Sequence, residues 1–538
     1  MNQSKLMSLL ILLRRLLYGL VYFGIMIVGI NRCNGQQPPS ILWQNAIGGS
    51  QEDGIMGMTA CPDGGYILVG TTQSTDGDLS ANQGMRDYLI CKLNSIGEVQ
   101  WIRNYGGSST DMAMNVLVAD DGGYFIVGNS SSTNGDFTGV SYGFTDVWVL
   151  KIDASGVIEW QRNYGGTNGD TVSDALMASN GDCILVGGTS SNDGNLSGNH
   201  GDVDFWVLRI DSFGEVQWSR CYGGSAYDAA QGIIESADGG FVIGGGTLSN
   251  NGDVTGNHGG YDCWIVKVNG NGDIQWQQTF GGSGFESISD VAELTSGDIV
   301  AVGSTESLDG DVGGVAGLRD VWVVRASASG ALLWQNTYGG SFDESAFTVV
   351  ETEFGGYVIG GTTSSNDGDV VGSNGQRDFW LFELSDENVM LWQGCYGGSA
   401  DDNGQVLLVD GVDGYCFAGT TASTDGDVVG GMGVTDAWII KVDQQQSSIS
   451  DYSMVANQLR VYPNPVLDIL YVELGNYCEE STSVDVYDAQ MTLVVNVGHY
   501  TSSLCEHSEI DISALNPGMY YVRVSKKDGE YYGRFIKM

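Results

Sequence analysis

The sequence is poor in basic residues. It has 22 Lys and Arg against 66 Asp and Glu, which gives its 538 residues a formal net charge of −44. Proteins that bind nucleic acid or anionic membranes need clustered Lys and Arg, because the phosphate groups of these partners are negatively charged. The composition therefore excludes nucleic acid as a partner and disfavours an anionic membrane surface. A strongly acidic surface instead suits a protein that works outside the cell.

Proline is scarce, and several familiar motifs are missing. The chain has 6 Pro and 10 Cys, but no Cys-x-x-Cys, His-Glu-x-x-His or Walker loop. These absences remove the usual zinc, thioredoxin-type and P-loop interpretations. His200 and His258 occupy equivalent positions in two Gly-Asn-His-Gly segments, which repetition explains better than a metal pair. Cys478 and Cys505 are the one pair within a small domain that is a candidate disulfide.

What the chain does contain is a regular repeat. Seven similar units of 58 residues fill its middle, apart from one step of 59. The first Gly of a Gly-Gly anchor recurs at Gly48, Gly106, Gly165, Gly223, Gly281, Gly339 and Gly397. An Asp that opens an apolar run recurs at Asp87, Asp146, Asp204, Asp262, Asp320, Asp378 and Asp436. A fixed period of this length marks units that bury their apolar faces against neighbouring units.

Each unit is predicted to form four short antiparallel strands. In the second unit the β-rich runs are separated by Gly-Gly and Ser-Gly turns, and the last run opens at Asp146. These turns supply the positive φ that hairpins require. No 3.6-residue apolar stripe occurs in the repeats, so helices are not expected there. Seven four-stranded units predict an all-β fold, a seven-bladed β-propeller.

The two ends of the repeat region predict how the propeller closes. A Trp marks one strand of each unit, at Trp43, Trp101, Trp160, Trp218, Trp276, Trp334 and Trp392. No such strand follows the last apolar run, Asp436–Asp443, whereas residues 41–47 form an extra strand before the first unit. We expect that strand to complete the last blade, because closure hides two sheet edges that otherwise invite aggregation.

The segment Lys151-Ile-Asp-x-x-Gly-x-x-x-Trp160 resembles the tryptophan-docking repeat of quinoprotein propellers. The resemblance implies that the Trp packs between adjacent blades, on an Asp-x-x-Gly turn. It covers about ten residues in each unit. Those enzymes usually have eight blades and often a vicinal cysteine pair, and this sequence has neither, so the quinone cofactor is not carried over.

The N-terminus has the pattern of a secretory signal. Lys5, Arg14 and Arg15 precede an apolar run from Leu16 to Ile30, and small residues follow near Gly35. Cleavage is expected before Gln36. A retained membrane anchor is the alternative, for which a run of 15 residues is short.

The last 80 or so residues form a different module. Val461-Tyr-Pro-Asn-Pro465, Val484-Asp-Val-Tyr-Asp488, Ile510–Val524 and the terminal Arg534-Phe-Ile-Lys-Met538 closely resemble the type A C-terminal sorting domain of the bacterial type IX secretion system. Met491 departs from the pattern, which commonly has Gly there. The resemblance implies interaction with the type IX machinery and export through the periplasm to the medium or the outer-membrane surface. Alternating apolar residues independently predict a small β-sandwich.

The predicted organisation therefore has four parts. They are a signal peptide at 1–35, a propeller at 36–443, a linker at 444–455 and a sorting domain at 456–538. The protein is expected to be monomeric.

Acidic loops are the candidate sites. Each unit has a loop close to Ser-x-Asp-Gly-Asp-x-x-Gly ahead of its strand-opening Asp, as with Asp76, Asp78 and Asp87 in the first unit. Oxygen ligands around a Gly suit Ca²⁺, which takes six to eight oxygens. The other interpretation is a tight turn in which Asp caps backbone amides. The candidate Ca²⁺ ligands are Asp76, Asp78, Asp87, Asp136, Asp146, Asp193, Asp204, Asp253, Asp262, Asp309, Asp311, Asp320, Asp367, Asp369, Asp378, Asp425, Asp427 and Asp436.

Two functional hypotheses stay open. The first is a non-enzymatic surface propeller that binds a glycan or protein through loops on one face, as in adhesion. The second is an extracellular hydrolase or lyase, active on glycans, with its site in a propeller pocket. No catalytic residue is predicted, because seven equivalent copies of an acid indicate a scaffold more than a single active centre. An enzyme should show one or two units with unusual polar residues near the axis.

Overall fold

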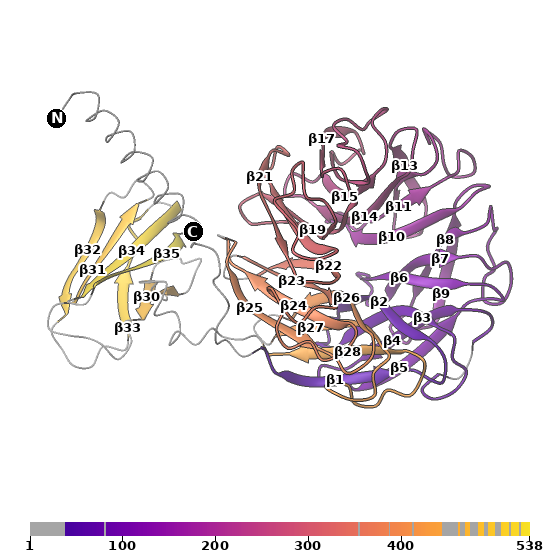
Figure 1. The fold of residues 1–538 in the computed structure, drawn as a ribbon, viewed down its shortest axis with the longest axis horizontal. Coiled ribbons are helices and arrows are strands. Elements are labelled where there is room, and N and C mark those ends of the chain that lie inside the picture. The colour runs from indigo at the N-terminus through magenta and orange to yellow at the C-terminus, as the bar shows by residue number, and fades with distance from the viewer. Residues whose placement is uncertain are drawn as a thin grey trace, which may run out of the picture. The chain divides into compact units, whose positions relative to one another are not determined.

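The computed structural model of the chain describes residues 38–79, 82–352, 356–386, 388–410, 414–443, 461–462, 469–473, 482–488, 493–500, 507–515, 518–526 and 529–537. Contacts divide the chain into two compact units, Met1–Gln444 and Gln445–Met538. The predicted signal peptide and the 444–455 linker lie outside the described residues, as do Cys478 and Cys505. The described part contains strands and no helix (Figure 1).

Seven four-stranded antiparallel sheets make up the first unit. Sheet 1 contains β2 (Asp53–Ala60), β3 (Tyr66–Thr72), β4 (Asp87–Leu93) and β5 (Val99–Tyr105). Sheet 2 contains β6 (Asp111–Val118), β7 (Tyr124–Ser130), β8 (Asp146–Ile152) and β9 (Ile158–Tyr164). Sheet 3 contains β10 (Asp170–Met177), β11 (Cys183–Thr189), β12 (Asp204–Ile210) and β13 (Val216–Tyr222). Sheet 4 contains β14 (Asp228–Glu235), β15 (Phe241–Thr247), β16 (Asp262–Val268) and β17 (Ile274–Phe280).

The remaining three sheets follow the same order. Sheet 5 contains β18 (Glu286–Glu293), β19 (Ile299–Thr305), β20 (Asp320–Ala326) and β21 (Leu332–Tyr338). Sheet 6 contains β22 (Glu344–Glu351), β23 (Tyr357–Thr363), β24 (Asp378–Leu384) and β25 (Met390–Tyr396). Sheet 7 contains β26 (Asp402–Val409), β27 (Tyr415–Thr421), β28 (Asp436–Val442) and, from the start of the chain, β1 (Ile41–Ile47).

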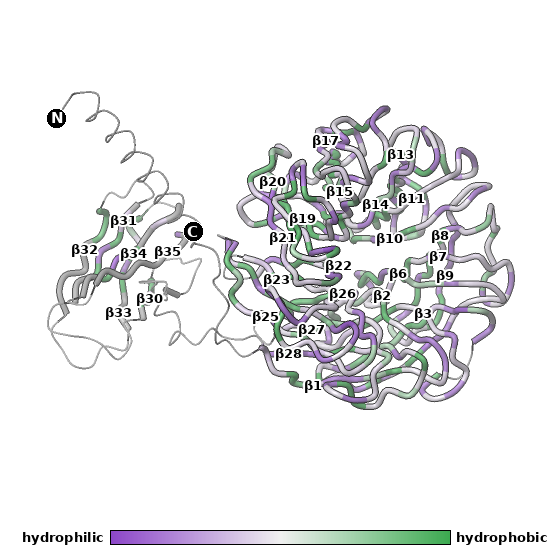
Figure 2. The backbone as a smooth tube through the Cα atoms, in the orientation of Figure 1, coloured by the Kyte–Doolittle hydropathy of each residue, from purple (hydrophilic) through white to green (hydrophobic). Residues whose placement is uncertain are grey.

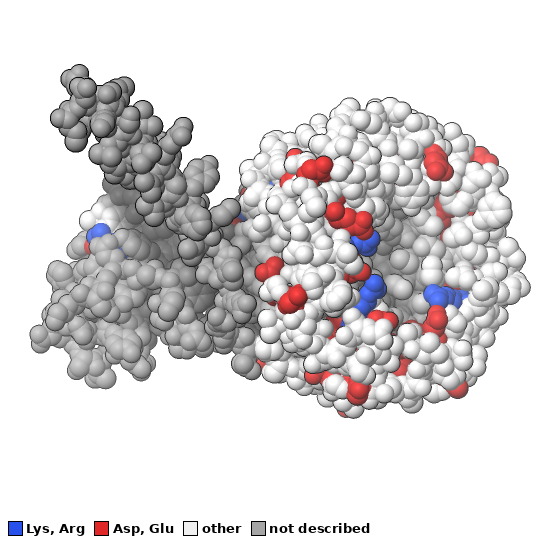
Figure 3. All heavy atoms as spheres, in the orientation of Figure 1, with Lys and Arg blue, Asp and Glu red and all other residues white. Residues whose placement is uncertain are grey.

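The sheets stand around a common centre, as in a β-propeller (Figure 1). The first strand of each sheet lies nearest the centre and is called the inner strand. The fourth strand lies at the periphery and is called the outer strand. Figure 3 shows a hollow in the middle of one face. β1 pairs antiparallel with β28, with Ile47 opposite Ala437 and Ile41 opposite Val442, so the N-terminal strand is the outer strand of sheet 7.

Burial explains the apolar runs of the sequence. Every residue of the second and third strands of sheet 2 is buried, because both faces of these strands are covered by neighbouring sheets. The outer strand β9 is only partly buried. Figure 2 accordingly shows hydrophobic residues concentrated along the strands, with hydrophilic residues mainly in the turns.

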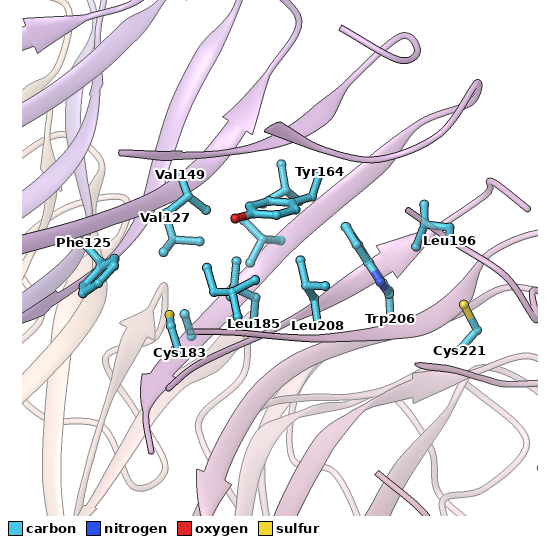
Figure 4. Packing of buried hydrophobic residues seen from close by; sticks show 14 of the residues in the cluster. Phe125, Val127, Val149, Tyr164, Cys183, Leu185, Leu196, Trp206, Leu208 and Cys221 are labelled. Carbon is cyan, nitrogen blue, oxygen red and sulfur yellow. The ribbon is translucent and has the colours of Figure 1, made fainter. Parts of the chain in front are cut away.

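The core consists of side chains packed between neighbouring sheets. In Figure 4, Phe125 and Val149 of sheet 2 face Leu185, Trp206 and Leu208 of sheet 3. All five are at most 3% exposed. Equivalent clusters lie between the other sheets, so each sheet is stabilised mainly by its two neighbours.

Aromatic residues of the outer strands also pack against the next sheet. Trp101 packs against Gly156, in the turn between β8 and β9, where an added Cβ would meet the indole ring. Tyr105 Oη donates a hydrogen bond of 2.6 Å to the carbonyl oxygen of Gly156. Trp43 of β1 packs on Gly97 of sheet 1 in the same way. These contacts connect adjacent sheets; the resemblance to quinoprotein repeats stays a prediction.

The second unit contains two antiparallel sheets. One has β29 (Val461–Tyr462), β30 (Ile469–Glu473) and β33 (His507–Asp511), and the other has β31 (Thr482–Asp488), β32 (Leu493–Tyr500), β34 (Gly518–Lys526) and β35 (Gly529–Lys537). Side chains of both sheets, including Leu470, Val486 and Val522, form one buried cluster. Two sheets around one core correspond to the small β-sandwich expected from the alternating pattern.

Two further findings concern the described residues. The seven cysteines among them are free thiols, and all are buried. No helix in this part of the chain has the length and apolar character needed to cross a membrane.

Candidate functional site

The acidic loops all lie at one end of the sheets. Each connects the second strand to the third strand of its sheet, as residues 73–86 connect β3 to β4. The surface formed by these seven loops is called the loop face. On the same side, each outer strand continues through a Gly-Gly linker into the inner strand of the next sheet. The region around one linker is called a junction.

The first acid of each loop accepts a hydrogen bond from a backbone N–H of the linker. Asp76 Oδ1 accepts a hydrogen bond from the backbone N–H of Ser50 at 2.7 Å. Asn134 and Asn251 make the same bond in their units, at 2.9 and 2.8 Å. A neutral amide oxygen therefore serves as well as a carboxylate. This position needs a hydrogen-bond acceptor and does not need a charge.

The second acid also accepts a backbone hydrogen bond. Asp78 Oδ2 lies 3.3 Å from the N–H of Gly48, and Asp136 Oδ2 lies 3.2 Å from that of Gly106. Asn195 takes this role in the third unit. Both loop acids thus satisfy N–H groups that the extended Gly-Gly linker leaves without strand partners.

Among the candidate acids, the strand-opening Asp is unusual because one of its oxygens has no hydrogen-bond partner. In every unit one of its oxygens, Oδ2, accepts a backbone N–H from the preceding loop, as Asp378 does from Asn374 at 2.5 Å. The other oxygen, Oδ1, has no hydrogen-bond partner, although all seven side chains are at most 3% exposed. Seven equivalent buried oxygens without a donor carry a substantial desolvation cost.

The position of that oxygen explains the first Gly of the anchor. A Cβ on Gly106 would overlap Asp87 Oδ1, and one on Gly48 would overlap Asp436 Oδ1. A second acid lies beside each Gly: Asp111 Oδ2 is 3.0 Å from the Cβ position of Gly106. The Gly is therefore required by the close approach of two carboxyl groups to the backbone.

The second acid beside each Gly opens the inner strand of the next sheet and was missed by the sequence analysis. This position holds Asp53, Asp111, Asp170, Asp228, Glu286, Glu344 and Asp402. Each accepts a hydrogen bond from the second Gly of the linker at 2.7 to 2.8 Å. An acid five residues after the first Gly in every unit was the available signal.

The candidate acids of one unit are divided between two junctions. Asp76 and Asp78 contact the linker that precedes their own sheet, whereas Asp87 contacts the linker that follows it. One junction therefore combines Asp87 of sheet 1 with Asp111 and Asp136 of sheet 2. In the structure, the three candidate acids of one unit therefore do not form a single site.

The strand-opening Asp residues have no Lys or Arg partner in the described part of the chain. Among the salt bridges of the described residues, none joins Lys or Arg to a strand-opening Asp. His200 and His258 instead approach Asp204 and Asp262, with Nδ1 at 2.7 and 2.8 Å from Oδ2. Within the described chain, no group of three or more His, Cys, Asp or Glu is arranged so that it could hold a metal ion.

Burial raises the pKa of the strand-opening Asp. The pKa of Asp87 and that of Asp378 both rise to about 6, first because burial penalises the charged form and further because neighbouring carboxylates repel it. A raised pKa in the folded state means that folding favours the protonated form. The stability contribution of these groups is complete below about pH 4 and is lost as the pH rises through about 6.

Asp378→Asn is therefore expected to stabilise the propeller at pH 7.5. The amide nitrogen can replace Oδ1 and donate to the neighbouring Asp402 and Asp427, while Oδ1 of the Asn keeps the bond from Asn374. We expect a gain of about 2 kcal/mol at pH 7.5 and a smaller loss of stability between pH 5 and 7.5. Urea unfolding followed by tryptophan fluorescence measures both.

Asp425→Asn is the matched control, because Asp425 is an exposed first loop acid whose equivalents in two units are Asn. It should leave the pH dependence above pH 5 unchanged. A destabilised D378N protein with the wild-type pH dependence would show that the charge of Asp378 is compensated.

Two further carboxyl groups break the sevenfold pattern near the centre. Asp174 and Asp290 lie on inner strands, where the equivalent residues of the other sheets are Gly57, Asn115, Gly232, Thr348 and Val406. Asp174 accepts the side-chain N–H of Asn115 and the backbone N–H groups of Ala175 and Ile233. Asp290 accepts those of Val291 and Val349.

Each of these two carboxylates links consecutive inner strands. Burial raises the pKa of Asp174 to about 6. Burial and then the charge of Asp174 raise the pKa of Asp290 to about 7. The pair meets the expectation of unusual polar residues near the axis. Its oxygens, however, already accept hydrogen bonds from residues of the inner strands.

Comparison with known proteins identifies the C-terminal module. Residues 460–538 match the family model described as "Secretion system C-terminal sorting domain". This domain carries the signal for type IX secretion, so the chain interacts with that machinery and is exported to the cell surface or released.

Other comparisons cover larger parts of the chain at low identity. The regulatory protein FlaEY of Caulobacter vibrioides is 24% identical over 388 residues, which cover 63% of this chain and 39% of that protein. The chain thus spans about two-fifths of the length of this curated relative. The Pan2 WD40 domain of Neurospora crassa has a TM-score of 0.40 at 11% identity, covering 72% of this chain and 91% of that one. YCF48 bound to D1 peptide has a TM-score of 0.35 at 9% identity, covering 76% and 100%.

Proposed function

We propose that the mature protein is a seven-bladed propeller, closed by β1, that acts as a binding scaffold at the cell surface or in the medium. The antiparallel pairing of β1 with β28 supports closure. Removal of an N-terminal signal peptide belongs to the same proposal, since passage through the periplasm precedes export by the type IX route.

Exposed apolar side chains on the loop face carry the binding proposal. Phe144 is 80% exposed, Leu308 76% and Phe342 56%, and all three lie in loops on that face. Surface loops on a rigid scaffold are common places for ligand binding, and aromatic side chains are enriched in binding interfaces. The ligand class is a glycan or a protein.

The test is direct binding of the purified propeller, residues 36–443, to arrays of glycans and of outer-membrane or host-matrix proteins. We expect saturable binding to at least one class, and weaker binding after Phe342→Ser. A substitution on a peripheral turn, Ile96→Ser, is the control, because Ile96 is similarly exposed at 62% but lies in the turn before β5. Absence of binding to every class would contradict the proposal.

A glycan-active hydrolase is the second candidate, and Asp174 with Asp290 is the observation that favours it. Acid–base hydrolysis of a glycosidic bond usually uses two carboxyl groups, one with a raised pKa that donates a proton and one that acts as the ionised base or nucleophile. If this candidate is correct, the propeller should release reducing sugar from a glycan, and Asp290→Asn should abolish that release without unfolding the protein. Unchanged release by the D290N variant would exclude Asp290 as a catalytic residue.

Calcium binding at the junctions is a separate proposal. The unpartnered Oδ1 atoms support it, whereas the missing metal-site geometry means that side chains would have to move to coordinate an ion. Ca²⁺ that binds only the folded state should raise the melting temperature as its concentration rises. Replacing Asp367 and Asp369 with Asn should weaken this response.

The measurement is a melting curve in millimolar Ca²⁺ and in chelator, with Mg²⁺ as the control for ionic strength. Identical curves in Ca²⁺ and in chelator would mean that the loops are ordinary turns.

A further inference from the structure

Residues that precede two kinds of strand meet at every junction of the loop face. The residue before each inner strand forms an isolated parallel bridge with the residue before the third strand of the preceding sheet. The seven pairs are Glu52 with Thr435, Arg86 with Thr110, Thr145 with Gly169, Val203 with Tyr227, Tyr261 with Phe285, Arg319 with Asp343, and Arg377 with Asp401. Most of these side chains are polar or small.

Two neighbouring junctions differ, because they bring three aromatic rings into a row. The rings of Tyr227 and Tyr261 are 6.2 Å apart between centroids, and those of Tyr261 and Phe285 are stacked at 5.0 Å with an angle of 14°. The guanidinium group of Arg319 lies 5.5 Å from the centroid of Phe285 and extends the row. Together these four residues are called the aromatic row.

Two rings of the row lie directly beside inner strands, on the loop face. Tyr227 immediately precedes the inner strand β14, and Phe285 immediately precedes the inner strand β18. Tyr227 is 41% exposed and Phe285 is 38% exposed. The row therefore presents apolar surface to solvent at the place where the chains of neighbouring sheets converge.

The backbone beneath the row leaves room for the ring of Tyr261. Tyr261 lies over Gly246 of β15, where an added Cβ would overlap the tyrosine ring. Five of the other six sheets have a side chain at this position, namely Thr71, Asn129, Ser304, Thr362 and Thr420. The remaining sheet has Gly188, which lies beneath Val203. Sheet 4 thus combines a large ring with the absence of a side chain below it.

The guanidinium group of the row is paired with a carboxylate. Glu306 Oε1 accepts hydrogen bonds from Arg319 Nε at 3.0 Å and from Arg319 Nη2 at 2.5 Å. The pair offers planar donors and acceptors but little net charge. The exposed Asp309 in the same loop and the overall charge of −44 repel anionic ligands.

These features fit one class of ligand. Aromatic rings with open surface bind the C–H faces of sugars, and planar side chains such as Arg and Glu bond adjacent hydroxyl groups. A row of three rings is longer than a single ring contact, so it suits a chain of sugars. We propose that Tyr227, Tyr261, Phe285 and Arg319 form a binding site for a neutral oligosaccharide. This assignment rests on the proposed binding function and names its ligand class and location.

The test measures binding of the full propeller to neutral oligosaccharides, such as gluco-, manno- and xylo-oligosaccharides, by isothermal titration calorimetry. Uronate-containing oligosaccharides and a panel of peptides provide the competing ligand classes. Tyr227→Ala combined with Phe285→Ala should weaken binding of the neutral oligosaccharide at least about tenfold. Tyr227→Phe should retain most of the affinity, because it keeps the ring.

Phe213→Ala is the matched control, because Phe213 is an aromatic residue that is 71% exposed and lies in the turn between β12 and β13, outside the loop face. It should bind as the wild type does, and melting curves should show all variants folded. Equal weakening by F213A, unchanged binding by the double variant, or binding of peptides or uronates alone would overturn the assignment while leaving a binding scaffold in place. No binding of any ligand class by the wild type would overturn both proposals.

Discussion

Removal of residues 36–47 is expected to lower the stability of the propeller sharply. The deletion takes away β1, which pairs with β28, and it removes the buried Ile47 and the partly buried Trp43 from the cluster shared with sheet 1. It also removes Gln44 Oε1, which accepts the indole N–H of Trp438 at 3.1 Å. We expect a loss of at least about 5 kcal/mol from the apolar burial alone.

Such a loss should lower the melting temperature by about 6 °C if the whole propeller unfolds in one step, since the entropy of unfolding scales with its roughly 400 residues. Differential scanning calorimetry measures this. The exposed β28 edge should also promote association, which light scattering detects.

Neighbouring residues of β1 provide a matched pair of controls. Trp43→Ala should be strongly destabilising, because the ring packs on Gly97 of sheet 1. Leu42→Ala should be nearly neutral, because Leu42 is 53% exposed. A truncated protein that melts at the full-length temperature would refute closure by β1.

Removal of residues 456–538 is expected to abolish surface delivery while the propeller stays folded. The sorting domain is the signal for type IX secretion, and the propeller has its own cores, separate from that of the second unit. In the host, the truncated protein should accumulate in the periplasm. Cell fractionation with surface proteolysis distinguishes periplasmic from surface protein.

Export should return when an unrelated type IX sorting domain is fused after residue 455, which controls for loss of folding. The melting temperature of the propeller should be the same with and without residues 456–538. Normal surface delivery of the truncated protein would contradict the role of this domain.

The sequence determined the repeated all-β architecture and the export route. The 58-residue period identified equivalent positions, the Gly turns separated four strands in each unit, and the missing Trp-strand after Asp436–Asp443 pointed to residues 41–47 as its replacement. These features can be predicted because they depend on short segments of sequence and on the number of residues between repeats. The motif around Tyr462-Pro-Asn-Pro465 identified the sorting domain, because its blocks are contiguous in the chain.

Only the tertiary structure decided what the acids do. A repeat period shows that Asp78 and Asp369 are equivalent, but it does not show which neighbouring unit a side chain meets. Loop acids contact the linker before their sheet because that linker has unpaired N–H groups, while the strand-opening Asp contacts the linker after it. The acids that look contiguous in the sequence are therefore split, and each junction is completed by an inner-strand acid such as Asp111.

The aromatic row and the pair Asp174 and Asp290 were likewise decided by tertiary structure. Tyr227, Tyr261 and Phe285 are 34 and 24 residues apart in the sequence, and each departs from its repeat position in a way that looks like drift. Their rings meet because parallel bridges place the starts of third and inner strands side by side on the loop face. Local pattern determines each strand, whereas contact between side chains of different units depends on how the sheets are placed around the centre.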